Sequence, residues 1–254
     1  MTGFRPFMRK ELIEIRRTWR LWVIPGMLVF LGLTSPIIAA VTPALVRSVT
    51  SSQPGVAIKL PTPTALDAFA QFLKNLDQFV LIAVIIAGAG AVSGERASGT
   101  AILMLTKPLS RSAFVSAKIV SQAILLAAST VLGTVACVVV TAAVFGEGNN
   151  ARLLMSVALW LLYASLLIVV MTLFSAAFHS RGAAAGAGLG FFFFTLLFSS
   201  WGPAAHYSFL GLMPAMGHAL TGQPQSLGWP LTTAVAAIVV GAWAAVRTFE
   251  RQEL

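Results

Sequence analysis

Long uncharged apolar runs alternate with short polar segments along the chain. A helix needs about 20 apolar residues to cross a hydrocarbon core about 30 Å thick, and six runs are of that order. They cover residues 21–46, 79–94, 119–145, 153–178, 182–201 and 229–246. The pattern predicts an all-α membrane protein with six transmembrane helices, forming a single transmembrane domain over residues 1–254.

The second run is short, but the sequence before it continues the same helix. Residues 64–67 resemble a capping box, and apolar residues recur at helical spacing over residues 66–80. We therefore expect one helix from about residue 65 to 94, partly outside the hydrocarbon. Its polar face would stand in water or against a partner, and it consists of Asp67, Gln71, Lys74 and Gln78.

Residues 1–20 combine apolar and basic positions around one predicted helix. The apolar positions at helical spacing are Phe4, Met8, Leu12, Ile15 and Trp19, and basic residues occupy the remaining surface. This pattern is typical of an amphipathic helix in the membrane interface, here an elbow leading into the first span. A generic positively charged anchor is the alternative. The following run, residues 21–46, exceeds the about 7 to 15 residues of a signal-peptide core, so we expect no cleavage.

The positions of Lys and Arg predict the orientation in the membrane. Cytoplasmic flanks carry the excess of positive residues, and with six spans both termini lie on one side. Thirteen of the 17 Lys and Arg fall on that side. We therefore expect a multi-pass protein of the inner (plasma) membrane with both termini in the cytoplasm.

Composition excludes several classes of protein. With 57% hydrophobic and 10% charged residues, the chain is not a soluble globular domain. Its net charge of +9 is not gathered into a basic patch suited to nucleic acid, so the bilayer is the expected partner. The single cysteine, Cys137, excludes an intrachain disulfide and a Cys-based zinc site.

The six runs contain no ionisable residue, which argues against a proton- or sodium-coupled carrier. The chain has no GxxxxGK[ST] loop, so any ATP hydrolysis is expected on a separate chain. A membrane enzyme would need converging acids, bases or metal ligands. His206 and His218 have no carboxylate near them in sequence and fit interfacial polar residues better. We expect no catalytic, cofactor-binding or metal-binding residue in this chain.

Small residues mark the fifth run. Gly182, Gly186 and Gly190 form two GxxxG steps, which allow close approach of helices in lipid. The packed face would lie within the chain, at a dimer seam or along a moving pathway helix. The four phenylalanines at 191–194 suit lipid or a hydrophobic substrate. Residues 202–228 hold three prolines and no stretch long enough to span, which predicts short re-entrant or interfacial helices on the outer side.

The loop between the second and third runs has the most specific pattern. A polar exit at Glu95 and Arg96 precedes a glycine break at Gly99, and a short amphipathic helix is expected over residues 100–105. A proline stop at Pro108 follows, and a new helix begins at Ser110. Such a helix on the cytoplasmic face is a natural docking surface for a soluble partner, although an ordinary intracellular loop is the alternative.

This loop resembles that of the membrane subunits of type-2 ABC transporters, which are mostly exporters. Their pattern runs E-R/K-x-x-G-T, several aliphatic positions, P-x-S-R and a Lys that opens the third span. The matching residues are Glu95, Arg96, Gly99, Thr100, Leu103, Leu105, Pro108, Ser110, Arg111 and Lys118. The resemblance implies that this loop holds a coupling helix that docks on a nucleotide-binding subunit. Glu95, Arg96 and Arg111 would hold the loop by polar pairing.

The resemblance also implies an assembly of two permeases, identical or related, with two ABC ATPase subunits. ATP and Mg would bind to the ATPases, and no cofactor would bind to this chain. An uncharged path lined by spans one, two and five would favour hydrophobic or amphiphilic cargo. A non-transporting membrane scaffold or assembly factor that binds the same ATPase is the alternative.

Overall fold

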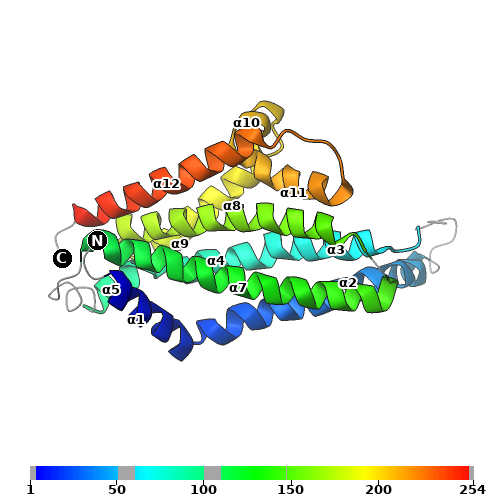
Figure 1. Ribbon diagram of the computed structural model, residues 1–254, viewed down its shortest axis with the longest axis horizontal. Coiled ribbons are helices and arrows are strands. Elements are labelled where there is room, and N and C mark those ends of the chain that lie inside the picture. The colour runs from blue at the N-terminus through cyan, green and yellow to red at the C-terminus, as the bar shows by residue number, and fades with distance from the viewer. Residues whose placement is uncertain (1–3, 51–60, 100–109, 147, 252–254) are drawn as a thin grey trace.

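The computed structural model describes residues 4–50, 61–99, 110–146 and 148–251 (Figure 1). Over these ranges the chain is helical and has no strand. Six helices are long and apolar enough to cross a membrane: Leu21–Ser48, Ala65–Ala97, Arg111–Phe145, Asn150–Ala177, Arg181–Phe198 and Gly228–Glu250. The prediction of an all-α protein with six candidate spans is therefore confirmed.

The first span packs along the third. Helix α1 (Phe4–Arg17) leads through a short turn into α2 (Arg20–Thr50), which lies beside α7 (Arg111–Phe145). The contact is closest where two isolated glycines meet. A Cβ added at Gly32 would overlap the Gly133 carbonyl oxygen, and one added at Gly133 would lie 2.7 Å from the Leu28 carbonyl oxygen. The two backbones therefore touch directly at this crossing.

The second span is irregular at two points. Helix α3 (Ala65–Asn75) begins with the predicted capping box, in which the Thr64 N–H donates to Asp67 Oδ2 at 2.8 Å. A π-helical turn, η1 (Leu76–Val80), then leads into α4 (Leu81–Ala89). The helix breaks over residues 90–92 before α5 (Ser93–Ala97).

The polar first half of this span packs against the middle of the first candidate span. Asn75 Nδ2 donates to Ser35 Oγ at 2.9 Å, and Ser35 is near the middle of the candidate span Leu21–Ser48. Both side chains are buried. Asn75 is therefore level with the centre of the first candidate span, and the expectation that the helix over residues 65–94 lies partly outside the hydrocarbon stays a prediction. A buried partner on α2 satisfies this polar side chain.

Helix α8 (Asn150–Ala177) forms the centre of the bundle. It packs against α4, α7, α9 (Arg181–Phe198) and α12 (Gly228–Glu250), and its Trp160 and Tyr163 are fully buried. The connection between α9 and α12 folds into α10 (Gly202–Tyr207), a 3-10 turn η2 (Phe209–Gly211) and α11 (Leu212–Thr221), all shorter than a span. Ser156 Oγ of α8 donates to the Met216 carbonyl at 2.8 Å and fixes α11 to the core.

Candidate functional site

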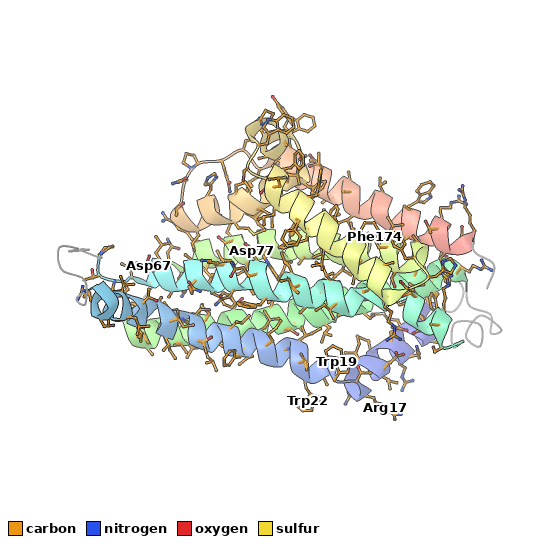
Figure 2. The ribbon with its side chains drawn as sticks, turned by 180° about the vertical axis from the view of Figure 1, so that it is seen from behind. Arg17, Trp19, Trp22, Asp67, Asp77 and Phe174 are labelled. Atoms are coloured by element: carbon orange, nitrogen blue, oxygen red, sulfur yellow. The ribbon has the colours of Figure 1, made fainter. Side chains whose placement is uncertain are left out.

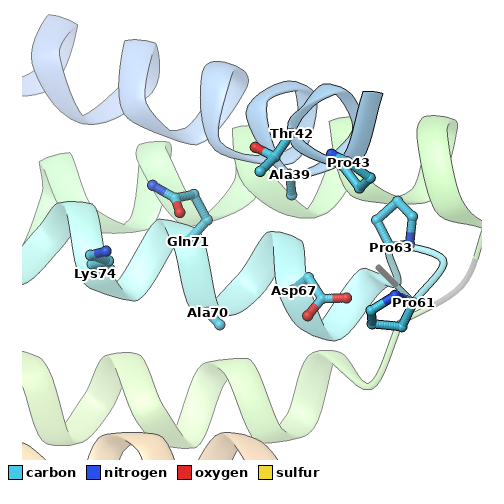
Figure 3. Close-up of a pocket in the computed structure, with 9 residues that line it drawn as sticks. All are labelled: Ala39, Thr42, Pro43, Pro61, Pro63, Asp67, Ala70, Gln71 and Lys74. Carbon is cyan, nitrogen blue, oxygen red and sulfur yellow. The ribbon is translucent and has the colours of Figure 1, made fainter. Parts of the chain in front are cut away.

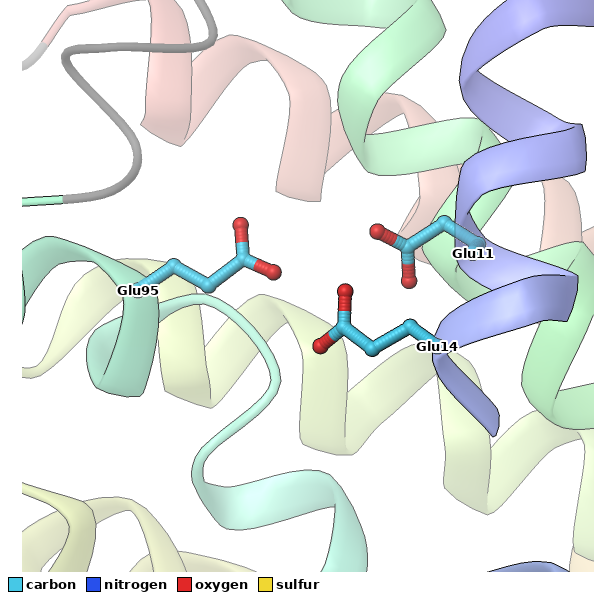
Figure 4. A group of neighbouring side chains, drawn as sticks. All are labelled: Glu11, Glu14 and Glu95. Carbon is cyan, nitrogen blue, oxygen red and sulfur yellow. The ribbon is translucent and has the colours of Figure 1, made fainter. Parts of the chain in front are cut away.

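Five charged side chains from three helices meet at the end of the molecule that carries both termini (Figure 1). Lys10, Glu11 and Glu14 lie on α1, Glu95 lies on α5 and Lys118 lies on α7. The three carboxylates point toward one another (Figure 4), with an oxygen from each within 4.8 Å of the others. We call these five residues the charge cluster.

Lys118 is the buried centre of the charge cluster. Its Nζ lies 2.6 Å from Glu95 Oε1 and 3.2 Å from Glu11 Oε1. Lys118 is 4% exposed and Glu11 is 6% exposed. Charges this buried are tolerated only when they are paired and hydrogen-bonded. The cluster therefore holds α1, α5 and α7 together by buried ion pairs, and breaking any of them would lower the free energy of unfolding.

The pKa of Lys10 is raised above its ordinary value. Burial alone would lower this pKa, but the hydrogen bond to Glu14 and the negative charges of Glu11 and Glu95 outweigh burial. Lys10 Nζ lies 2.5 Å from Glu14 Oε2 and 3.1 Å from Glu11 Oε1. Lys10 therefore remains an ammonium and forms the outer half of the cluster.

Three neighbouring carboxylates also match the ligand type of a hard metal ion. Here Glu11 Oε1 and Glu95 Oε1 each lie within 3.4 Å of both lysine nitrogens. A cation at this point would have to displace Lys10 or Lys118. The geometry fits a salt-bridge cluster and not a metal site.

Aromatic rings extend the cluster to a fourth helix. The Lys118 ammonium lies 5.0 Å from the centroid of Phe114, in cation–π range. Phe114 contacts Phe7 of α1 at 5.2 Å and stacks on Phe249 of α12 at 5.1 Å between centroids. The end of α12 is therefore packed onto the same assembly as α1 and α7.

The two flanks of the predicted coupling loop attach to different helices. On one flank, Arg96 Nη1 donates to the Ala176 carbonyl of α8 at 3.1 Å, and Gly99 has the positive φ of +71° that favours glycine. On the other flank, Arg111 Nη1 donates to the Glu250 carbonyl of α12 at 2.7 Å. The predicted short helix lies outside the described residues, as do its members Thr100, Leu103, Leu105 and Pro108.

A cavity of about 460 Å³ lies beside the charge cluster and the broken end of the second span. Arg181, at the start of α9, reaches across it: a Cβ added at Gly94 would lie 2.8 Å from Arg181 Nη2. One at Gly90 would lie 3.4 Å from the same side chain. Glycine at these two positions therefore leaves room for the guanidinium against the backbone of the second span.

Ser175 of α8 replaces the backbone hydrogen bonds that are missing at the helix break. Its Oγ accepts hydrogen bonds from the N–H groups of Val92 and Ser93 at 3.0 and 3.1 Å. It also donates to the Ala89 carbonyl at 2.8 Å. One buried hydroxyl thus stabilises the break between α4 and α5.

We expect Ser175→Ala to lower the free energy of unfolding by about 1 to 3 kcal/mol, because it leaves two buried amides without an acceptor. Ser165→Ala is the matched control, since the Ser165 hydroxyl donates to the Leu161 carbonyl of its own helix. Chemical unfolding in detergent micelles measures both. Equal effects of the two changes would contradict this role for Ser175.

The glycines of the fifth span lie on an open face. No described atom lies within 4 Å of a Cβ added at Gly182, Gly186 or Gly190. Close packing within the chain occurs instead at Gly188, where an added Cβ would overlap Met171. Among the described residues, the three GxxxG glycines therefore make no close contact within the chain, and the within-chain, dimer-seam and pathway-helix alternatives all stay predictions.

Among the described residues, neither His206 nor His218 belongs to a group of metal-ligating side chains, and His206 contacts the Tyr207 ring at 4.5 Å between centroids. His206 and His218 are both exposed, and His218 Nδ1 lies 3.2 Å from the Gln225 Oε1 amide oxygen.

Glu11 was not identified as a site residue from the sequence. Its signal was present, because an acidic residue four positions after Phe7 and four before Ile15 lies on their face of a helix.

Six helices of membrane length, an amphipathic N-terminal helix and a buried charge cluster define a polytopic helical membrane protein. Residues 6–216 match the model of the ABC-2 family transporter proteins, and the chain belongs to this family. It is therefore an integral membrane protein related to the membrane subunits of ABC transporters. The resemblance seen in the loop motif is confirmed.

The chain is also similar to two curated proteins, one named as a transmembrane protein and one as a probable ABC transporter permease. The chain is 23% identical over 255 residues to "Uncharacterized transmembrane protein YxlG" of Bacillus subtilis (strain 168), covering 97% of this chain and 96% of that protein. It is 31% identical over 195 residues to "Probable ABC transporter permease protein NosY" of Pseudomonas aeruginosa. The second match covers 75% of this chain and 66% of NosY.

Proposed function

We propose that this chain is the permease subunit of an ATP-driven exporter and is powered by a separate ABC ATPase that docks on residues 95–111. The observation that carries the proposal is the charge cluster, which lies directly at the flank of that loop. Lys118 connects Glu95, at the loop's first flank, to Glu11 of α1. ATP and Mg would bind to the ATPase, and this chain would bind no cofactor.

The anchored flanks suit a loop that transmits movement. Displacement of the loop by a partner would reach α7 and α1 through Glu95, α8 through Arg96 and α12 through Arg111. Buried ion pairs such as Lys118 with Glu11 and Glu95 resist local rearrangement, so these helices would move with the loop. A scaffold that binds the same ATPase would share the docking site but would couple it to no flux.

The remaining membrane arrangement follows from α1 and the charge distribution. The protein-facing side of α1 is Phe7, Glu11 and Ile15, while Leu12 and Trp19 are exposed by 37% and 58%. Of the predicted apolar stripe only Ile15 is buried. The exposed members suit an elbow helix in the cytoplasmic interface, and Trp22 points away from the bundle near the junction of α1 and α2 (Figure 2).

We extend the proposal to topology and assembly. The excess of Lys and Arg at the α1 end supports cytoplasmic termini in the inner membrane and a single transmembrane domain. The short helices α10 and α11 would close the outer end of the path as re-entrant or interfacial elements. The open glycine face of α9 would contact a second, identical or related permease.

Gentle purification of the tagged chain from its native membrane tests the docking. We expect an ABC ATPase to co-purify, and we expect Glu95→Ala and Arg111→Ala each to reduce its recovery or its stimulated ATP turnover several-fold. Arg247→Ala, a change at a residue whose side chain is 58% exposed, is the control. Purification without an ATPase would contradict the docking site, and an ATPase without any ATP-dependent flux would favour the scaffold.

A further inference from the structure

A second cavity, of about 600 Å³, lies between the π-helical turn η1, helix α9 and helix α11. Its walls combine apolar side chains with a carboxylate. Phe192, Phe193, Leu196 and Met213 line one part, and Asp77 and Gln78 line another. A cavity of this size with a few polar groups among apolar ones matches small-ligand sites, which are about 300 to 1,000 Å³.

Asp77 lies at membrane depth. It is two residues after Asn75, which bonds to Ser35 near the middle of the first span. Figure 2 places it well inside the length of the bundle. The six apolar runs contain no ionisable residue, but the helix that the chain actually forms carries this one into the membrane region. A carboxyl group at such a depth marks a functional site by default.

The Asp77 side chain is partly buried, its Oδ1 atom is fully buried, and no described cation pairs with it. Its Oδ1 has no hydrogen-bond partner among the described residues, and no described Lys, Arg or His lies within 4 Å of it. The Trp160 indole interacts with this carboxyl, but its N–H is an uncharged donor and supplies no positive charge. The nearby hydroxyls of Tyr163 and Thr195 bond to each other at 2.5 Å. The π turn, a feature frequent at functional sites, places Asp77 here.

We propose that this cavity binds a small amphiphile through a cationic ammonium group, with Asp77 as the counter-ion. The inference rests on the proposed function and names its class of cargo. An ammonium would supply the charge partner that the carboxyl lacks, and the rings of Phe192 and Phe193 would add cation–π attraction and apolar contact. The cargo path is therefore not uncharged, as the six runs alone indicated.

Lys74 is the positive group that faces the same cavity, one turn before Asp77. It is exposed, and it also lines a neighbouring cavity of about 360 Å³ between the ends of α2 and α3 (Figure 3). Asp67 and Gln71 line that neighbouring cavity as well. Lys74 thus marks the polar mouth shared by both cavities, while Asp77 lies farther in. An anionic ligand would favour Lys74 and oppose Asp77.

The test uses three dansyl probes that differ only at the end of an eight-carbon chain: ammonium, methyl or carboxylate. The full chain, with any subunits that co-purify, is placed in phosphatidylcholine nanodiscs, and empty nanodiscs give the background. We expect the ammonium probe to bind about tenfold more tightly than the methyl probe, as a charge-assisted contact predicts. Asp77→Asn should abolish this preference and leave binding of the methyl probe unchanged, whereas Lys74→Gln should retain it.

Equal binding of the ammonium and methyl probes, preference for the carboxylate probe, or an unchanged preference in Asp77→Asn would each overturn the proposal. If Asp77→Asn does not fold, two results decide: the preference of the unmodified chain and the loss of ammonium binding in Met213→Trp, which fills the cavity. Co-purification of the ATPase needs no probe. A failure of the cargo site can therefore be told apart from a failure of the proposed function.

Discussion

Lys118→Met is expected to lower the free energy of unfolding by about 3 to 5 kcal/mol and to uncouple ATP turnover from the permease. The change removes the one ammonium that lies within 3.2 Å of both Glu11 and Glu95. Removing one partner of a buried ion pair is the costly case, and here the two carboxylates would keep only the more exposed Lys10 as a charge partner. Chemical unfolding in mixed micelles measures the stability, and ATPase activity of the purified complex measures the coupling.

Arg247→Met is the matched control at the same end of the molecule. Arg247 pairs with Glu250 at 3.5 Å, but its side chain is 58% exposed, so its loss should change stability by less than about 1 kcal/mol. Adding Glu11→Gln and Glu95→Gln to Lys118→Met should restore much of the stability, because no buried charge then lacks a partner. Equal effects of Lys118→Met and Arg247→Met would show that the cluster is not a buried network.

The number of spans was predictable from the sequence, because an apolar run of membrane length is a local property. The packing of the polar first half of the second span was not. Asn75 and Asp77 look like residues of a polar, partly exposed segment, and only Ser35, 40 positions earlier, shows that they lie among the helices. A partner distant in sequence decides whether a polar residue is exposed or buried.

The candidate site was predictable only in part: the loop residues could be identified from the sequence, and their partner on α1 could not. The loop motif selected Glu95, Arg96 and Arg111, and the structure gives each a defined contact. The partner Glu11 was missed because the rotation of α1 about its axis depends on tertiary packing. The apolar stripe of α1 predicts one buried face, whereas the face that packs against the other helices contains Phe7 and Glu11. An apolar helix face at a membrane can be buried either in lipid or against protein, and the sequence does not distinguish the two.

The spacing of glycines in the sequence likewise does not show which of them pack against another helix. Gly32→Val is expected to lower the free energy of unfolding by about 3 kcal/mol or more, because its Cβ would overlap the carbonyl oxygen of Gly133 on α7. Backbone cannot rotate away as a flexible side chain can, so α2 and α7 would have to separate. Chemical unfolding in micelles provides the measurement.

Gly186→Val is the matched control, with the same added side chain on an open helix face. It should leave the unfolding of the single chain within about 1 kcal/mol of the original, since valine is no worse than glycine in a helix. Stability that falls equally in both variants would contradict the close crossing at Gly32. If Gly186→Val instead abolishes chemical cross-linking between two copies while each copy stays folded, the GxxxG residues form an interface between permeases. In that case Gly32 and Gly133 stabilise the fold of each copy, and Gly182, Gly186 and Gly190 stabilise the contact between copies.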